Sequence, residues 1–298
     1  MPYSRYLIGQ LPWYSVLVCA GILSAVLWCM HEEKRRGLKP DTIVDLALWV
    51  IPCGIIGARL YFVLFSFDSY RNNLLDILKV WEGGLAIYGG ILAGGAAAIS
   101  FAYRRKLHPL LLTDIIVPGL ALAQAIGRWG NFFNMEAYGS TVENAALCFF
   151  PLAVAIPEGG TIVWHYATFF YESMWNLLVF ALLALNTKKL PRGLTTVGYF
   201  LLYGAGRFTI EQLRTDSLML LGLRVSQWLS LLLLTAALVA LLVRCVSKGK
   251  RIQAALAAGL VALGIAALLC RFGFLSQLCF SVCVAAGGLC CLLSLKEE

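Results

Sequence analysis

Long apolar runs recur along the chain, and they constrain its fold more than any other feature. A helix that crosses a bilayer needs about 20 predominantly apolar residues. Runs of that length begin near Leu11, Thr42, Leu85, Leu111, Ala167, Thr196, Val225, Ile252 and Phe274. Hydrophobic residues make up 60% of the 298 positions and charged residues only 13%. The sequence therefore predicts an all-α, polytopic integral membrane bundle with about nine spans.

Basic residues are concentrated in every second connector between these runs. The connectors at 31–39, 103–108, 186–192 and 244–251 hold 14 of the 24 Lys and Arg residues. Short loops rich in Lys and Arg stay on the cytoplasmic side of a membrane. We therefore expect the N-terminus and residues 129–166 outside and the C-terminus inside. In a membrane protein the location of basic residues matters more than the net charge of +8, so we expect no nucleic-acid partner.

One stretch beside an apolar run is unusually polar, and it reads Gly127-Arg128-Trp129-Gly130-Asn131-Phe132-Phe133-Asn134-Met135-Glu136-Ala137-Tyr138-Gly139. Placing an arginine near hydrocarbon costs at least about 2.5 kcal/mol, so Arg128 needs a partner or a substrate. The glycines allow the backbone to approach a ligand closely. The outer segment 129–166 follows, and a connection of about 40 residues is uncommon without a function.

A second polar face lies inside a predicted span. Tyr203, Arg207 and Glu211 recur at every fourth position, so they share one face of a helix. Arg128 and Arg207 on different spans suit a phosphate ester, because guanidinium groups bind phosphate oxygens with paired, charge-assisted hydrogen bonds. The phosphate available in a membrane is that of a phospholipid headgroup.

We expect the polar residues of several spans to converge on one outer site. The residues in question are Tyr88, Arg128, Asn131, Glu136, Glu172, Tyr203, Arg207 and Glu211. In this hypothesis Glu136 and Glu211 fix the arginine rotamers, and the amides of Asn131 and Asn134 bind glycerol hydroxyls or backbone groups.

Through several motifs in a consistent order, the chain resembles the bacterial prolipoprotein diacylglyceryl transferases. The most specific match is Gly127-Arg128-x-x-Asn131-Phe132-x-Asn134-x-Glu136-x-x-Gly139. Supporting matches are Trp13-Tyr14, residues 57–65, Trp81-Glu82-Gly83-Gly84, Gly89-Gly90, Asp114, His165, Tyr171-Glu172, residues 203–214 and Gln227. The resemblance covers about residues 11–243.

The resemblance implies the first step of lipoprotein maturation. The diacylglyceryl group of phosphatidylglycerol moves to the lipobox cysteine thiol of a prolipoprotein signal peptide, and glycerol phosphate leaves. This implies a multi-pass protein of the bacterial cell membrane, with its active site towards the outer face and with no cofactor or metal. Arg128 and Arg207 would stabilise the leaving anion. The residues expected to bind substrate are Tyr14, Asn131, Asn134, Glu136, Gly139, Tyr203 and Glu211.

Tyr88 departs from the family pattern. Family members commonly have histidine in a Gly-Gly-x-x-x-His-Gly-Gly stretch, and this chain has Tyr88 at that position. Tyrosine has a pKa of about 10, so Tyr88 would act as a base only beside a cationic group that lowers its pKa. The alternative is that Tyr88 only orients the substrate. The thiol itself has a pKa of about 8.5, so a modest base or a cationic pocket is sufficient to form thiolate.

The C-terminal end is the second departure. The family pattern ends after about seven spans, whereas residues 248–298 add an apolar hairpin of two further spans. We therefore expect a transferase core at 1–247, which includes the outer segment 129–166, and an accessory packing element at 248–298 without polar chemistry.

Several site residues have a structural alternative. Arg128 and Arg207 would then be salt-bridge residues, and Asn131 and Asn134 would satisfy a helix end. Gly139 would serve close packing. Tyr14 and Tyr203 would be aromatic residues at the membrane interface. His165 would be a structural histidine.

Other functional classes also place arginines in a membrane bundle. A transporter for an anionic, phosphate-bearing substrate would do so at broken helices, and a lipid-binding protein would keep the arginine pair without turnover. The sequence contains no Gly-x-Ser-x-Gly or His-Glu-x-x-His motif, which argues against a membrane hydrolase or protease with those signatures.

Overall fold

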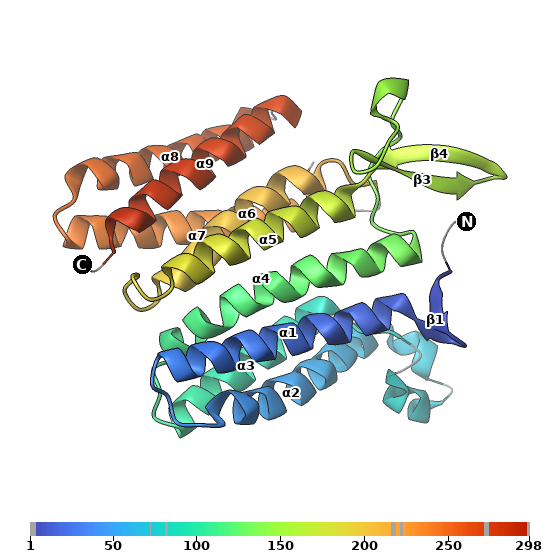
Figure 1. Ribbon diagram of the computed structural model, residues 1–298, viewed down its shortest axis with the longest axis horizontal. Helices are drawn as coiled ribbons and strands as arrows, with labels where there is room; N and C mark the ends of the chain where they lie inside the picture. Colours follow the sequence, from blue (N-terminus) through green and yellow to red (C-terminus); the bar gives the residue numbers. More distant parts are fainter. Residues whose placement is uncertain are drawn as a thin grey trace. The chain divides into compact units, whose positions relative to one another are not determined.

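The structure, a computed structural model, describes residues 4–71, 73–80, 83–215, 219–220, 223–270 and 274–296. Most of this part is helical (Figure 1). The α-helices are α1 (Trp13–Arg35), α2 (Thr42–Phe65), α3 (Ile87–Arg104), α4 (Pro109–Asn134), α5 (Thr168–Asn186), α6 (Leu194–Glu211), α7 (Val225–Ser247), α8 (Arg251–Cys270) and α9 (Phe274–Ser294). Each of them begins within a few residues of a predicted apolar run.

Within the described residues, six helices are long and apolar enough to cross a membrane, namely α1, α2, α4, α5, α7 and most of α9. By contrast, α3 is rich in glycine and α6 carries Arg207 and Glu211, which lowers the mean hydropathy of both helices. The prediction of a polytopic helical membrane protein is confirmed at this level. The number of nine spans and the orientation stay predictions.

The all-α prediction needs a correction, because short antiparallel hairpins join some of the helices. The strand pairs are β1 (Tyr6–Ile8) with β2 (Leu11–Pro12), β3 (Ala153–Glu158) with β4 (Thr161–Tyr166), and β5 (Met219–Leu220) with β6 (Leu223–Arg224). Among the described residues, the connectors also contain the short 3-10 helices η1 (Phe67–Tyr70), η2 (Leu74–Leu78) and η4 (Ala145–Leu147).

Residues 129–166 are also more ordered than the predicted loop. Helix α4 continues through this boundary and ends only where Met135 adopts a positive φ of 52°. Strand β3 then buries Val154 and Ile156 in a small cluster with Phe169. Gly159 and Gly160, with φ of 56° and 87°, form the tight turn to β4, a conformation that glycine adopts without strain.

The contacts divide the chain into two compact units, residues 26–115 and residues 1–25 with 116–298. In the unit 26–115, α2 and α3 approach closely at a pair of glycines. A Cβ atom on Gly57 would lie 2.7 Å from the carbonyl oxygen of Gly89. Only glycine permits so close a crossing, which is how helices commonly pack in membranes.

Arg59 on α2 organises the connector between α2 and α3. Its guanidinium is buried and donates hydrogen bonds of 2.6 to 2.8 Å to the carbonyl oxygens of Ile77, Asp76 and Gly83. These bonds satisfy the buried charge and fix the connector. The motif residues Trp81 and Glu82 lie outside the described residues.

In the other unit, α6 is the central helix and packs against α5, α7 and α9. Leu201 and Leu202 are buried in its core. Helix α9 comes close through Gly288, where an added Cβ would lie 2.5 Å from a methyl carbon of Leu201. Helix α4 is joined to α5 by Ser173, whose hydroxyl donates to the Ala125 carbonyl at 2.7 Å.

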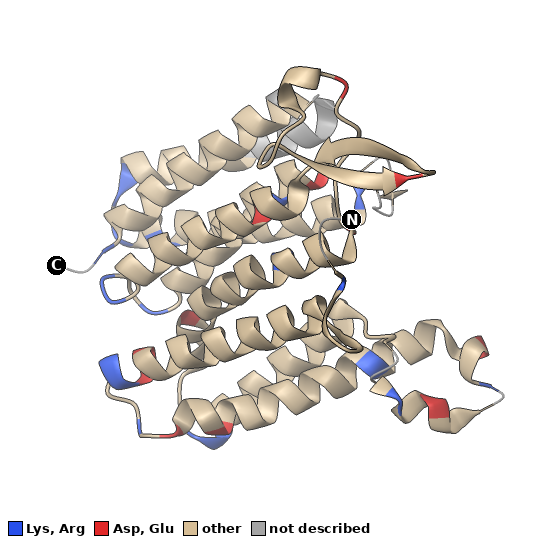
Figure 2. Ribbon diagram, turned by 45° about the vertical axis from the view of Figure 1, so that its right-hand side comes forward, with Lys and Arg blue, Asp and Glu red and all other residues tan. Residues whose placement is uncertain are grey.

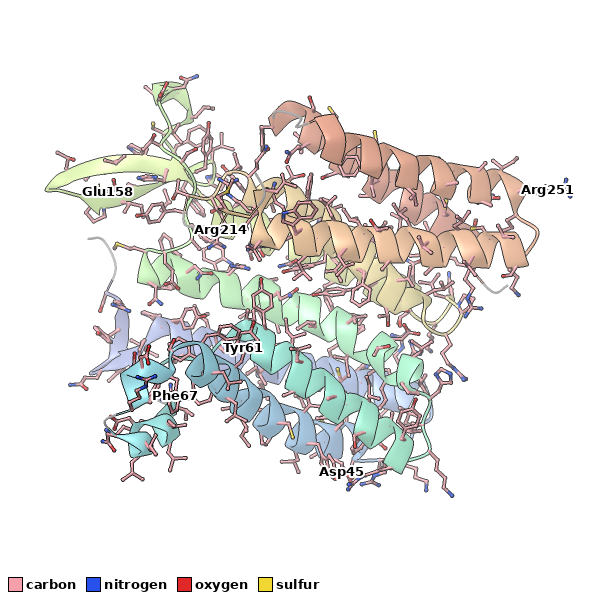
Figure 3. All side chains as sticks on the ribbon, turned by 180° about the vertical axis from the view of Figure 1, so that it is seen from behind. Asp45, Tyr61, Phe67, Glu158, Arg214 and Arg251 are labelled. Atoms are coloured by element: carbon pink, nitrogen blue, oxygen red, sulfur yellow. The ribbon has the colours of Figure 1, made fainter. Side chains whose placement is uncertain are left out.

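The basic connectors of each unit lie at one end of its helices. In the unit 26–115, Arg105 at the end of α3 is paired with Asp45 in the first turn of α2. In the other unit, Arg244 donates to the Arg192 carbonyl at 3.5 Å and links the α5–α6 connector to α7. Figure 2 shows Lys and Arg at these turns. Within that unit, the labelled Arg251 lies at the opposite end from Glu158 (Figure 3). This is the charge pattern of alternating spans.

The C-terminal helices form part of this unit's core and carry more polar contacts than expected. The Thr209 hydroxyl of α6 donates to the Ser281 hydroxyl of α9 at 2.7 Å. The Gln227 amide of α7 donates to the Gln277 side chain at 3.4 Å. Buried polar groups on α6 and α7 thus find their partners on α9, and the accessory packing role of this segment stays a prediction.

Candidate functional site

A buried network of charged side chains joins α4, α5 and α6. Arg128 Nη2 on α4 lies 2.6 Å from Glu172 Oε1 on α5, and Arg207 Nη1 on α6 lies 2.6 Å from Glu172 Oε2. Arg207 Nη2 also lies 2.7 Å from Glu211 Oε2, one turn along α6. We call these four residues the arginine cluster. Glu172 is its centre, because one carboxylate contacts both arginines.

The charges of the arginine cluster balance. Both carboxylates are only 4% exposed, and the Arg207 and Arg128 side chains are 13% and 23% exposed. Two arginines face two glutamates, so each buried charge has a partner of opposite sign, as burial requires. A guanidinium has five N–H donors, so these contacts leave both arginines able to receive a further anion.

Amide side chains extend the network from α4 to the turn that follows it. Asn131 and Asn134 donate to the same oxygen of Glu136 at 2.9 and 3.3 Å. Asn131 in turn accepts a 3.5 Å hydrogen bond from Arg128 Nη1. The positive φ of Met135 and Ala137, 52° and 57°, folds this turn back so that Glu136 reaches the amides.

Two details of the expected site therefore need correction. Glu136 does not fix Arg128 directly, because its recorded contacts are with Asn131 and Asn134. The carboxylate at Arg128 is Glu172, which comes from a different helix. The sequence predicts that Glu172 converges on the site but assigns it no function. A carboxylate within an apolar span is the sequence signal that indicates such a function.

The aromatic candidates lie on the helices of the same unit. Tyr203 stacks on Tyr199, with ring centroids 5.3 Å apart and planes at 13°. Tyr14 packs against Gly130, where an added Cβ would come within 2.8 Å of the tyrosine ring. The glycine therefore lets α1 and α4 approach beside Arg128.

Gly139 and His165 hold the hairpin of β3 and β4 to the end of α6. Gly139 forms an isolated bridge with Arg214, which is labelled in Figure 3. An added Cβ on Gly139 would lie 2.8 Å from Tyr166 Cβ, so this position requires glycine for close packing. His165 is buried, with Nδ1 2.9 Å from the Gly139 carbonyl and Nε2 3.2 Å from Glu158. These contacts give His165 a structural role.

Tyr88 lies near the start of α3, in the unit 26–115. Its ring centroid is 6.5 Å from that of Tyr61, and the residue is 39% exposed. Its proposed place at the substrate rests on the sequence resemblance alone.

Replacement of Tyr88 by Phe tests whether its hydroxyl takes part in proton transfer. If the hydroxyl helps to remove the thiol proton, turnover should fall by about 100-fold, as is typical for loss of a general base. Initial rates with a cysteine peptide give the measurement. Tyr61→Phe is the matched control, since Tyr61 is its ring neighbour on α2. Full activity in Tyr88→Phe would remove the hydroxyl from the mechanism.

Fold and site together define a class, a helical membrane protein with a buried arginine–carboxylate network at the ends of α4 and α6. Comparison with known proteins narrows this class. A family model described as prolipoprotein diacylglyceryl transferase matches residues 5–243. The chain belongs to this family.

Curated relatives carry the same description. A phosphatidylglycerol–prolipoprotein diacylglyceryl transferase of Streptococcus pneumoniae is 46% identical over 225 residues, which cover 74% of this chain and 85% of the relative. One of Streptococcus agalactiae serotype Ia is 42% identical over 235 residues, which cover 78% of this chain and 91% of the relative. The resemblance of the sequence motifs is thereby confirmed.

Proposed function

We propose that this protein transfers the diacylglyceryl group of phosphatidylglycerol to the lipobox cysteine of prolipoproteins. In the reaction, the cysteine sulfur forms a bond to the terminal glycerol carbon of diacylglycerol, and the bond between that carbon and the phosphate oxygen breaks. The thiol proton leaves to a base, and glycerol phosphate leaves as an anion. The names of the relatives and the arginine cluster support this proposal.

The observation that carries the proposal is the bridge that Glu172 makes between two arginines on different helices. Its two oxygens hold the two guanidinium groups side by side through contacts within the protein. Donors that are already positioned stabilise a developing anion without reorganisation during the reaction. Arg128 and Arg207 therefore bind the phosphate and stabilise the leaving glycerol phosphate, while Glu172 and Glu211 set their positions.

The remaining site residues have supporting roles. Asn131 and Asn134 with Glu136 form the polar wall beside Arg128 and orient the headgroup glycerol. Tyr14 and Tyr203 flank the lipid, and Gly139 keeps the hairpin of β3 and β4 next to this wall. The protein lies in the bacterial cell membrane with this site towards the outer face, and the substrate lipid enters between the spans because its two chains stay in the bilayer.

A reconstituted assay tests the proposal. Purified protein is incubated with phosphatidylglycerol and a lipobox peptide, and mass spectrometry follows the diacylglyceryl thioether. We expect the product with the wild-type chain and a loss of about 100- to 1,000-fold with Arg128→Ala, as for removal of an anion-stabilising donor. Arg71→Ala, a surface arginine paired with Asp68, is the control.

The same preparation separates the rival functions. Flux of a phosphate-bearing solute into proteoliposomes without thioether formation would identify a transporter. Lipid binding without turnover would identify a lipid-binding protein, and either result would contradict the proposal.

A further inference from the structure

A second layer of polar side chains lies one helical turn from the arginine cluster, between the same three helices, which lie side by side (Figure 1). Each helix carries a polar residue four positions further from the hairpin of β3 and β4, namely Gln124 on α4, Asn176 on α5 and Tyr203 on α6. Residues four apart differ by about 40° around a helix and by about 6 Å along its axis. These three residues, together with Tyr199 of α6, are here called the amide–tyrosine layer.

Hydrogen bonds between the helices fix the amide–tyrosine layer. The Tyr199 hydroxyl donates to Gln124 Oε1 at 3.1 Å and joins α6 to α4. The Ser173 hydroxyl of α5 donates to the Ala125 carbonyl of α4 at 2.7 Å. The Trp175 indole N–H of α5 donates to a backbone carbonyl of α6 at 2.8 Å. The three helices are therefore held together at the depth of this layer.

Asn176 points into the space between α4 and α6. Around α5 it lies about 40° from Glu172 and about 60° from Ser173. Glu172 contacts both α4 and α6, and Ser173 contacts α4. Asn176 itself is 0% exposed. Its amide therefore lies on the face of α5 that carries the centre of the arginine cluster.

The Asn176 amide has no hydrogen-bond partner among the residues that the structure describes. This holds for both Nδ2 and Oδ1. The residue lies near the middle of α5, a helix apolar enough to cross a membrane. A buried amide without a partner costs folding free energy, and polar residues inside membrane helices are typically functional. The position therefore indicates a ligand for this amide.

The chemistry of the amide–tyrosine layer favours a neutral ligand that accepts hydrogen bonds. Asn176 and Gln124 each carry an NH₂ group with two donors, and the layer contains no charged residue. A phosphate held by the arginine cluster lies about 6 Å away along the helix axes. In a diacyl phospholipid, one glycerol unit separates the phosphate from the ester carbonyls, which only accept hydrogen bonds. Gln124 and Tyr203 are partly exposed, so the layer is open on their side.

We propose that the Asn176 amide donates a hydrogen bond to an ester carbonyl of the substrate phospholipid. The inference rests on the proposed function. The arginine cluster then binds the phosphate, and the amide–tyrosine layer binds the ester end of the same glycerol. Attachment at both ends fixes the terminal glycerol carbon in the orientation that the attacking sulfur requires.

Lipid analogues test this inference on the wild-type protein. Thioether formation is measured with diester phosphatidylglycerol and with diether phosphatidylglycerol of the same chain length, in which the ester carbonyls are absent. The KM of the diether lipid should be about fivefold higher, as expected for the loss of one neutral hydrogen bond. Equal KM values for the two lipids would overturn the inference.

Replacement of Asn176 by Leu separates a contact with the substrate from a structural role. Leucine has a similar volume, and the fold loses no hydrogen bond, so the midpoint of thermal unfolding should equal or exceed that of the wild type. The KM for the diester lipid should rise about fivefold, and the ratio of the diether to the diester KM should fall to about one. Asn186→Leu is the matched control on the same helix, where Asn186 donates to the Leu182 carbonyl at 2.6 Å. It should keep the wild-type ratio.

Two other results would contradict the ester contact. One is an Asn176→Leu protein that keeps the wild-type ratio of the two KM values. The other is a variant in which only the KM for the lipobox peptide rises, because the amide would then bind the acceptor peptide. A wild-type protein that forms no thioether with either lipid would instead overturn the proposed function.

Discussion

Replacement of Glu172 by Gln is expected to reduce transferase activity by about 100- to 1,000-fold, the range seen when a preorganised anion-stabilising donor is lost. Each oxygen of the Glu172 carboxylate contacts a different arginine at 2.6 Å. A glutamine keeps the shape but presents an NH₂ group to one guanidinium, so a donor faces a donor. One arginine then loses its position relative to the other.

The control for this variant must distinguish a loss of folding stability from a loss of the arginine positions in the arginine cluster. Breaking a buried ion pair by removing one partner costs about 3–5 kcal/mol, so the midpoint of thermal unfolding in detergent is measured beside the thioether rate. Glu158→Gln is the matched change, because Glu158 is 43% exposed and pairs with His165 outside the arginine cluster. A folded Glu172→Gln protein with the specific activity of the wild type would leave the cluster a purely structural role.

Replacement of Arg207 by Lys is expected to be almost as damaging, although the charge is retained. Arg207 uses Nη1 for Glu172 and Nη2 for Glu211. Lysine has a single nitrogen on a flexible chain and cannot reproduce this planar fork. We expect activity to fall by about 100-fold, the lower end of the effect of losing a preorganised donor, with the larger change in kcat.

Arg192→Lys is the comparison for this variant, since Arg192 is an exposed residue of the connector before α6. Its activity should equal that of the wild type. If Arg207→Lys also retained wild-type kcat, a positive charge alone would be sufficient to stabilise the leaving anion. The planar fork of the guanidinium would then not be required. A change in KM alone would assign Arg207 to ground-state binding rather than to the leaving anion.

The helices themselves were predictable because the signal for them is local. The apolar runs place the starts of α2, α7 and α9 at the residues where the structure begins them. The Arg207–Glu211 pair was also predictable, since residues four apart on a helix are neighbours whatever surrounds them. The hairpin of β3 and β4 was not predicted, because polar content and length alone assigned this stretch to a loop.

The sequence by itself thus determined the membrane class of the protein, the positions of its helices, its family and the two arginines of the site. The tertiary structure alone decided that Glu172 joins those arginines, and that Glu172 rather than the neighbouring Glu136 contacts Arg128. It also decided that Tyr199 of α6 donates to Gln124 of α4. The physical reason is that hydropathy and helical periodicity are properties of one segment, whereas contacts between helices depend on their rotation and register, which packing across the whole unit sets.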